Sequence, residues 1–473
     1  MSRMIVALSA LFLIYFDYSP AIGQELPPQL ADGLNEINEQ RVGSTLQFLC
    51  SDAMGGRGTG SQEFRIAAAY VRSRLDAAGA EGGGFEGSFF HTKQLTLSQT
   101  PSQSIDIELE SETISTFGLL NGGEDDVHIQ GNVGQLDDEW KLPDDAHAKV
   151  AVVKLEAGSE REQRSVFFRI SNACVRLKQS GVEALIICLP ADHQMVTLAK
   201  QLRAKPRPYV PQRAIALPVV LVDRKHAESL SKSTVQFDVP AQVKSEYEAQ
   251  NVIGFMRGSD PELSKECILF SAHLDHLGST DDLTAEDRVY NGADDDASGV
   301  TAVLTLADAF SKLPVRPKRS IVFMTFWGEE SGLLGSKDFA ANPSWPLEKI
   351  VANINIEMIG RPEPGATNKL WMTGWNESDL GKLLNEGAQA VGVDIFEHPQ
   401  FSAMLYRQSD NWSFVEKGVI AHSVSGGSLH EDYHQLSDEF EKMNIPHMTE
   451  VIKGLFVGSL PLANAEVTPQ KSK

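Results

Sequence analysis

Basic residues are few in this sequence relative to acidic ones. Its 42 Lys and Arg residues stand against 64 Asp and Glu residues, so the formal net charge is −22 at pH 7. Proteins bind nucleic acids and anionic membranes through basic patches, which such a composition does not favour. We therefore expect no nucleic-acid partner, and we interpret the acidic balance as a well-solvated surface.

Cysteine is also scarce, with four residues in the whole sequence. No two of them stand in a Cys-x-x-Cys spacing, which argues against a zinc site built from thiolates. Cys188 and Cys267 fall inside apolar runs, where a thiol usually packs as a small buried hydrophobic group. If there is one disulfide, the sequence favours Cys174–Cys188, because both residues lie in the same short segment.

Hydrophobic runs are short, and the clearest one lies at the N-terminus. Arg3 precedes the apolar stretch Met4 to Phe16, and small residues follow up to Gly23. This order is typical of a secretory signal peptide cleaved near Gly23, although an uncleaved anchor is the alternative. No later run reaches about 18 apolar residues. We expect an exported protein, periplasmic or secreted, without stable insertion in a membrane.

The length of 473 residues exceeds the usual size of one hydrophobic core, so we expect two domains. Apolar strands alternate with helices after residue 245, which predicts an α/β fold with a mostly parallel, doubly wound sheet. A second strand–helix–strand pattern between residues 127 and 244 indicates a smaller inserted α/β domain. The predicted divisions are a signal peptide (1–23), an N-terminal part of the main domain (24–126), the insertion (127–244), the catalytic domain (245–460) and a disordered tail (461–473).

Polar residues follow three of the predicted buried strands at their carboxyl ends. His273 and Asp275 come after the strand 267–272, Glu329 and Glu330 follow the strand 320–326, and Glu357 ends the strand 350–356. Ligands of open α/β sheets bind at this edge. Imidazole and carboxylate groups from three strands therefore predict a metal centre there.

Two groups of adjacent carboxylates support this prediction. Asp294, Asp295 and Asp296 precede a helix, and together they repel one another beyond what helix capping requires. A cation would relieve this repulsion, and one of the three carboxylates could bridge two cations. By the same argument, one member of the Glu329–Glu330 pair would bind metal and the other would stay free as a general base.

A histidine near the C-terminus is expected to complete the site, since imidazole is the commonest nitrogen ligand of zinc. Four residues compete for this role by spacing alone: His422, His430, His434 and His447.

The motifs HLDHLG, NGADDDASG, GEESGLLGS, NIEMIGR and DYHQLSD, in this order and spacing, resemble the di-zinc aminopeptidase family over residues 251–448. That family includes bacterial leucyl aminopeptidases and, more distantly, glutamate carboxypeptidases and glutaminyl cyclases. The insertion is similar to the protease-associated domain in the order of its elements and in its strands KVAVVKL and LPVVLV.

This resemblance implies two Zn²⁺ ions and a role for each matching residue. The implied ligands are His273 and Glu357 for one ion, Glu330 and His434 for the other, and Asp295 for both. Glu329 would be the general acid and base, and Asp275 would orient His273. The family also implies a cis peptide bond after Asp295. Glu357 departs from the common pattern, because the best-known members have Asp at this position.

The implied function is that of an aminopeptidase that hydrolyses N-terminal peptide bonds of substrates with a free N-terminus. The alternatives are a carboxypeptidase or glutaminyl cyclase on the same scaffold, and a non-catalytic binding protein. We expect a preference for apolar first residues, because apolar side chains of the late loops could line a pocket. These side chains are Phe401, Met404, Tyr406, Trp412 and Phe414.

Overall fold

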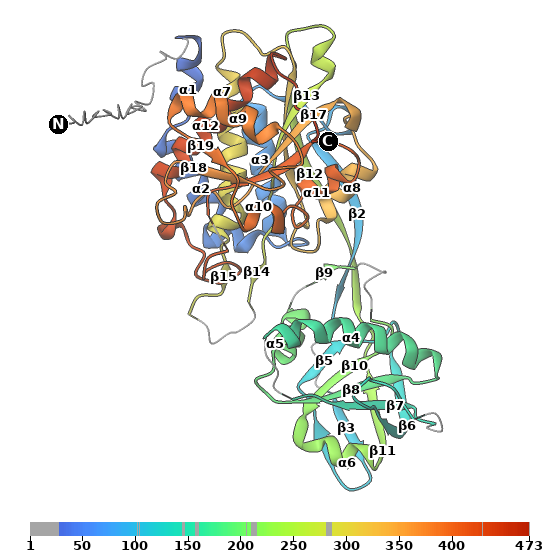
Figure 1. The fold of residues 1–473 in the computed structure, drawn as a ribbon. Coiled ribbons are helices and arrows are strands. Elements are labelled where there is room, and N and C mark those ends of the chain that lie inside the picture. Colours follow the sequence, from blue (N-terminus) through green and yellow to red (C-terminus); the bar gives the residue numbers. More distant parts are fainter. Residues whose placement is uncertain are drawn as a thin grey trace, which may run out of the picture.

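The computed structural model describes residues 28–101, 103, 105–143, 147–156, 160–204, 206–209, 215–280, 286–427 and 429–472. The chain forms two bodies joined by a long antiparallel ribbon (Figure 1). The ribbon consists of β2 (Phe90–Gln99) and β12 (Val243–Met256). Its register runs from Phe90 opposite Val252 to Gln99 opposite Val243. The chain therefore leaves the first body along β2, forms the second body, and returns along β12.

A ten-stranded sheet forms the centre of the first body. Its four central strands run parallel, in the spatial order β20 (Ala421–Ser425), β17 (Ile350–Ile356), β13 (Cys267–His273) and β16 (Ser320–Phe326). Beyond β20 lie β18 (Lys369–Met372) and β19 (Asp394–Phe396), and beyond β16 lie β12, β2 and β9 (Arg207–Pro208). The predicted α/β fold is confirmed, with the parallel strands at its centre and antiparallel pairs toward its edges.

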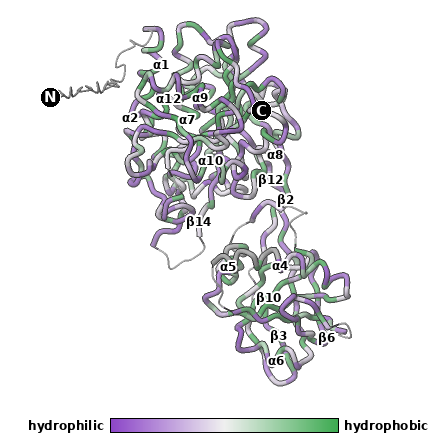
Figure 2. Tube along the Cα trace, in the orientation of Figure 1, coloured by the Kyte–Doolittle hydropathy of each residue, from purple (hydrophilic) through white to green (hydrophobic). Residues whose placement is uncertain are grey.

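Helices cover both faces of this sheet, because its strands are apolar on both sides. Ile268 and Phe270 of β13 belong to a core shared with α2 (Glu39–Leu49), α3 (Gln62–Ala77), α7 (Gly299–Ser311), α9 (Leu380–Ala388) and α12 (Ile445–Ala463). Leu269 points to the opposite face and shares a core with α8 (Leu334–Ala341) and α11 (Asn411–Val415). Figure 2 shows the hydrophobic segments gathered inside each body.

The second body has an eight-stranded sheet and hydrophobic cores of its own. Its strands are, in spatial order, β4 (Thr113–Ser115), β3 (Asp106–Leu109), β11 (Thr234–Val239), β6 (Val127–Gln135), β7 (Val150–Lys154), β8 (Ala184–Leu189), β10 (Val219–Asp223) and β5 (Gly118–Asn121). Its helices are α4 (Glu160–Gln179), α5 (Gln194–Ala204) and α6 (Ala227–Ser231). Because β3, β4 and β5 belong to this sheet, the second body begins before residue 127. Its likeness to a protease-associated domain stays a prediction.

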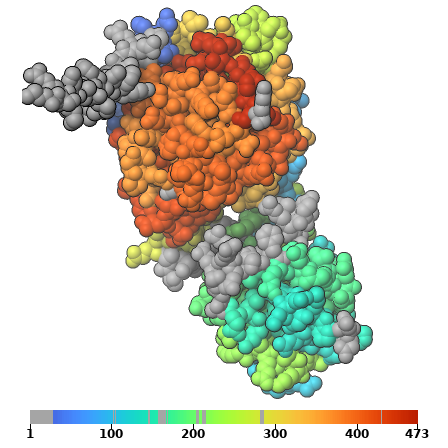
Figure 3. Space-filling model, in the orientation of Figure 1, coloured from blue at the N-terminus to red at the C-terminus, as the bar shows by residue number. Residues whose placement is uncertain are grey.

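Figure 3 shows the C-terminal part of the chain, coloured orange to red, over the visible face of the first body. The second body lies below it in the same view. The structure describes no helix that combines the length and the apolar character needed to cross a bilayer. The predicted signal peptide lies outside the described residues.

The cysteine pairing that the sequence favoured is wrong. All four cysteines are buried free thiols. Cys174 lies on α4 in the core on one face of the second sheet, whereas Cys188 lies on β8 and points into the core on the other face. The sheet therefore separates two residues that are close in sequence.

The prediction of a disordered tail over 461–473 is wrong for the described residues 461–472. Helix α12 continues to Ala463, and the residues after it are bound to the first body. The Arg319 guanidinium donates to the Thr468 hydroxyl at 2.8 Å, and the Ser472 amide donates to the Glu377 carbonyl at 2.9 Å. The polar residues of the tail therefore form hydrogen bonds with the surface of the first body.

Candidate metal centre

The strand ends of the central sheet bring the predicted site residues to one place. His273 is the last residue of β13, Glu329 and Glu330 follow β16, and Glu357 follows β17 directly. Asp295 lies in the helical turn Ala293–Ser298 that precedes α7. Because β13, β16 and β17 are adjacent and parallel, their carboxyl ends meet at one edge of the sheet.

Asp295 lies between two histidines. Its Oδ1 is 3.1 Å from His273 Nε2, and its Oδ2 is 3.1 Å from His434 Nε2. His434 Nε2 is also 3.1 Å from Oε2 of Glu330. One carboxylate thus offers one oxygen toward each imidazole, which is the geometry that a bridging ligand between two ions requires.

The three competing histidines lie elsewhere. His422 contacts the Ser378 hydroxyl and the Thr373 carbonyl, and His447 Nδ1 accepts a hydrogen bond from the Asn368 amide. His430 lies 3.1 Å from Oδ2 of Asp294. Among the four candidates, His434 lies next to Asp295 and Glu330.

Backbone amides relieve the repulsion among the three adjacent aspartates. Asp296 Oδ1 accepts from the amides of Gly299 and Met358, and Asp294 Oδ1 accepts from the Gly360 amide at 2.7 Å. The sequence argument assigned this neutralisation to a cation. Only Asp295 of the three lies between the two imidazoles, and the peptide bond after it is cis, as the family resemblance implied.

Glu357 is held at the His273 side of the centre. The Asn355 amide donates to its Oε1 at 2.8 Å, and the Ser409 hydroxyl lies against the same oxygen. Burial raises the pKa of Glu357 to about 8, and the neighbouring carboxylates of Asp410 and Asp295 add to this effect. Without a cation, the Glu357 side chain therefore favours its protonated form near neutral pH.

Asp275 supports two other site residues with different atoms. Its main-chain carbonyl oxygen lies 2.9 Å from Nδ1 of His273, whereas its carboxylate is 3.9 Å from that nitrogen. The carboxylate accepts hydrogen bonds from the Thr59 hydroxyl at 2.9 Å and from the Glu329 amide at 3.1 Å. The main-chain carbonyl of Asp275 thus contacts His273 in place of the carboxylate that the resemblance implied. The Asp275 carboxylate instead holds the loop that carries Glu329.

The site divides its carboxylates into two electrostatic classes. Burial raises the pKa of Glu329 well above its usual value, and Glu330 and other nearby carboxylates raise it further. Burial acts in the same direction on Glu330, but His276 and His434 outweigh it and lower the pKa of Glu330 to about 2. The centre therefore holds Glu330 in its charged form, whereas Glu329 and Glu357 favour their protonated forms when no cation is bound.

Arg57 is a supporting residue that sequence reasoning missed. Its buried guanidinium donates to the carbonyl oxygens of Leu49, Leu274, Asn291 and Gly292, at 2.6 to 3.0 Å. These carbonyls belong to the N-terminal helices and to both loops that carry site residues. The sequence feature that could have indicated this role is the single arginine in the glycine-rich stretch MGGRGTGS. The glycines alone predict a loop and give no reason for a buried guanidinium.

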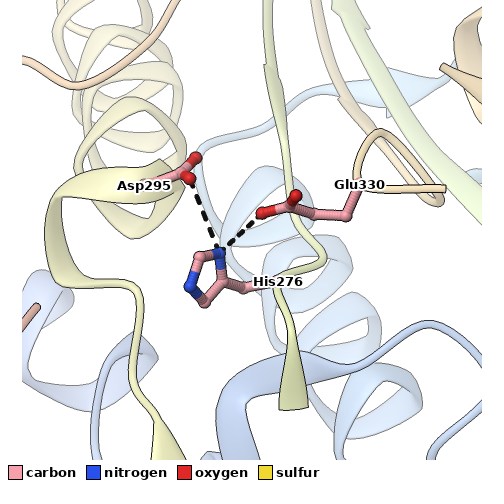
Figure 4. A group of neighbouring side chains, drawn as sticks. All are labelled: His276, Asp295 and Glu330. Atoms are coloured by element: carbon pink, nitrogen blue, oxygen red, sulfur yellow. Dashed lines mark ion pairs between the residues drawn. The ribbon is translucent and has the colours of Figure 1, made fainter. Parts of the chain in front are cut away.

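His276 is the second residue that the sequence argument left without a role. It lies in the HLDHLG motif and forms a group with Asp295 and Glu330 whose potential ligand atoms all lie within 4.8 Å of one another (Figure 4). Both its ring nitrogens are buried without a hydrogen-bond partner, as are Asp295 Oδ2 and Glu330 Oε1.

The donor set at this edge fits zinc. Zinc binds imidazole nitrogen and carboxylate oxygen, and both are present with unpartnered atoms directed at a common space. Buried polar atoms are rarely left without a partner, so these atoms indicate a missing ligand.

Comparisons with known proteins agree with this chemistry. Residues 251–456 match the model of Peptidase family M28. A "Probable zinc metalloprotease" of Pyrenophora tritici-repentis is 43% identical over 218 residues, which cover 38% of this chain and 49% of the relative. A "Vacuolar membrane protease" of Saccharomyces cerevisiae is 25% identical over 230 residues, or 47% of this chain and 21% of the relative. The chain thus spans about a fifth of one relative and half of the other.

Solved structures share the fold. An aminopeptidase from Aneurinibacillus sp. strain AM-1 is 19% identical, with a TM-score of 0.56, over 92% of this chain and 96% of that one. A zinc aminopeptidase from Bacillus subtilis is 17% identical, with a TM-score of 0.58, over 91% and 96%. The family match runs from β12 to α12 and contains all the predicted site residues. The part of the chain that carries the site, residues 251–456, is thus similar to Peptidase family M28.

Proposed function

We propose that this protein is an exported zinc aminopeptidase that removes N-terminal residues from peptides. The observation that carries the proposal is the placement of Asp295 between His273 and His434, beside Glu329 and a cavity at the same sheet edge. The match to Peptidase family M28 and the fold shared with the solved aminopeptidases support the same reaction class. Export rests on the predicted signal peptide alone.

Five side chains would hold two zinc ions. His273 and Glu357 would bind one ion, Glu330 and His434 the other, and Asp295 both. When bound, zinc supplies Lewis acidity, which polarises a carbonyl group and lowers the pKa of water. A cation at this place would also release the protons that burial holds on the neighbouring carboxylates.

Glu329 would move the proton. It lines the same cavity as His273, Asp295 and Glu357, and its backbone is fixed by the Asp275 carboxylate. A general base takes the proton of the attacking water, and the same group then returns it to the leaving amine.

The cavity beside Glu329 would receive the N-terminal residue of the substrate. Its volume is about 100 Å³, which suits one side chain better than a longer run of residues. Its apolar walls are Met358, Trp371, Leu405, Leu429 and Tyr433. The late-loop residues expected to form this pocket lie elsewhere: Phe414 is in a hydrophobic core, and Tyr406 stacks on His422.

The charge of this cavity favours an amine over a carboxylate terminus. Asp295, Glu329 and Glu357 line it, and none of the described lining residues is Lys or Arg. A free α-ammonium group is attracted to such a surface, whereas the C-terminal carboxylate that a carboxypeptidase must bind is repelled. This is the reason for proposing an aminopeptidase.

A second cavity of about 240 Å³ is lined by Glu330 and would accommodate the rest of the peptide. It is lined by Asp275, His276 and the glycine-rich segment around Gly58, and by Pro206 and Pro208 at strand β9, which pairs with β2 at the edge of the first sheet. The segment that carries β9 would thus contribute to binding the leaving peptide.

The test combines metal analysis with two matched substrates. Purified protein should contain two zinc ions and should cleave leucyl-anilide but not N-acetyl-leucyl-anilide. Equal cleavage of the acetylated substrate would contradict an aminopeptidase. Bound zinc without hydrolysis of any aminoacyl or peptidyl substrate would favour a binding protein instead.

A further inference from the structure

His276 is enclosed at the centre without a hydrogen bond to either ring nitrogen. Its exposed fraction is 2%, and within the described residues neither Nδ1 nor Nε2 has a hydrogen-bond partner. Leaving a buried polar group without a partner is costly, and native proteins rarely do so. The imidazole therefore requires a partner that is neither a side chain nor a backbone group of the described chain.

The environment of Nδ1 indicates which partner this is. Nδ1 lies 2.8 Å from Glu330 Oε1 and 3.7 Å from Asp295 Oδ2, and Figure 4 shows one ring nitrogen facing both carboxylates. The contact with Glu330 lacks the geometry of a hydrogen bond, since both of its atoms remain without a partner. Three potential ligand atoms without hydrogen-bond partners surround one space, and a cation bound there would satisfy all three.

Packing holds the ring in this orientation. Gly292 has a φ of +54°, and a Cβ atom at this position would lie 2.5 Å from Cδ2 and 2.6 Å from Cγ of His276. The His276 amide donates to the Arg57 carbonyl at 3.4 Å, and its backbone pairs with Gly58. A residue with a side chain at position 292 would therefore overlap the His276 ring, so glycine at this position leaves the ring its place in the site.

We propose that Nδ1 of His276 is a further ligand of the ion held by Asp295, Glu330 and His434. This inference rests on the proposed zinc centre and makes its two sites unequal. The site with Glu357 has one imidazole, whereas the site with Glu330 has two. Nitrogen ligands favour zinc and cobalt over magnesium and calcium, so the Glu330 site binds zinc more tightly and releases it last.

The experiment compares metal binding by wild-type protein with that of His276→Ala and His276→Asn. The asparagine variant keeps a polar group beside Gly292 if the alanine variant fails to fold. His422→Ala is the matched control, because His422 is equally buried, at 1% exposure, but contacts Ser378 and Thr373 instead of the proposed site. Zinc affinity is measured by competition with a chelator, and ligand imidazoles are counted from paramagnetically shifted N–H resonances of the cobalt-loaded protein.

Wild-type protein should show three shifted imidazole resonances and should lose its two ions in two separate steps. Each His276 variant should show two resonances, and its tighter site should weaken by more than the roughly 10–100-fold that loss of a supporting partner costs. His422→Ala should match wild type.

The outcomes separate this inference from the proposed function. Wild-type protein that binds no zinc would overturn both. Two bound ions with two imidazole resonances in wild type, unchanged in the His276 variants, would overturn the ligand assignment alone. A variant that keeps three resonances and wild-type affinity would do the same.

Discussion

The sheets of the two bodies share a run of parallel strands, but the bodies differ in how many polar side chains they bury. Each sheet contains four adjacent parallel strands, β20, β17, β13 and β16 in the first body and β6, β7, β8 and β10 in the second. Among the described residues, few polar side chains of the second body are buried, His193 being one of them, whereas the first body buries a group of carboxylates and histidines at its strand ends.

Charges at the strand ends of the second body are paired at the surface. Glu156, just after β7, forms an ion pair with Arg224, just after β10. In the first body, the nearest guanidinium, that of Arg57, donates its hydrogen bonds to carbonyl oxygens. The parallel sheet supplies the place for a site in both bodies, but within the described residues it is the first body that gathers there the carboxylates and histidines of the proposed metal centre.

The largest expected effect comes from Asp295→Asn, which keeps the shape of the side chain and removes its charge. Both ions should be lost, because both sites share this carboxylate, and turnover should fall to background. Zinc content after gel filtration and hydrolysis of leucyl-anilide measure these changes. Asp223→Asn, at the end of β10 in the second body, is the control and should leave both values unchanged. If Asp295→Asn keeps both ions, the Asp295 carboxylate is not shared by two metal sites in the first body.

Glu329→Gln should separate proton transfer from metal binding. Zinc content should stay at the wild-type value, while kcat falls about 10²–10⁴-fold, the contribution of a positioned general base. Glu156→Gln, after a strand end of the second body, serves as the control for a lost carboxylate. A metal-loaded Glu329→Gln protein with wild-type kcat would show that another group moves the proton.

The chelator-treated protein should lose stability as the pH rises from about 5 to 8. Burial raises the pKa of Asp275 to about 7 and that of Glu357 to about 8, so the folded state keeps protons that the unfolded state has released. Each such proton lowers the free energy of unfolding by about 1.4 kcal/mol per pH unit. The pKa of His434 is raised to about 10 in the folded state, so this residue also lowers the free energy of unfolding as the pH rises above its pKa in the unfolded state.

Urea denaturation midpoints at three pH values test this prediction. Saturating zinc should flatten the dependence, because bound carboxylates are deprotonated in the folded state. Glu357→Gln should reduce the slope in chelator, because one proton-binding group is removed. Stability of the chelator-treated protein that rises over this range would mean that the carboxylates are already neutralised by another group.

The strands that position the site could be predicted because they are apolar on both faces. The segments 320–326 and 350–356 form β16 and β17 with these bounds, and polar residues directly after them mark the sheet edge. Spacing could not choose among the four late histidines, because the loop between β20 and α12 brings His434 to Asp295 through tertiary contacts. The family resemblance supplied that choice, and the geometry agrees with it.

The errors of the sequence reasoning have a common cause in long-range partners. Arg57 was assigned no role from the sequence, because the carbonyl groups that bind it belong to residues more than 200 positions away as well as to Leu49. The C-terminal tail was read as disordered, because the partners of its backbone lie on the first body. Local composition does not report such partners.

The smallest expected effect comes from removing the second body. Gln99 faces Val243 across the ribbon, so an Asn-Gly turn in place of residues 100–242 would close β2 and β12 as a two-residue hairpin. The excised segment includes the short edge strand β9 of the first sheet but no residue of the two hydrophobic cores of the first body, so the shortened chain should fold and bind two zinc ions. Its kcat/KM for leucyl-anilide should change by less than about tenfold, or about 1.4 kcal/mol.

Longer peptides should respond differently to this excision, because Pro206 and Pro208 line the second cavity together with Glu330. The KM for a leucyl pentapeptide should rise, while the KM for leucyl-anilide, which does not reach that cavity, should stay the same. Equal changes for both substrates would mean that the second body acts on the centre as a whole. Loss of zinc would mean that the two bodies are not independent, since a sheet with its own core should keep its strand ends in place.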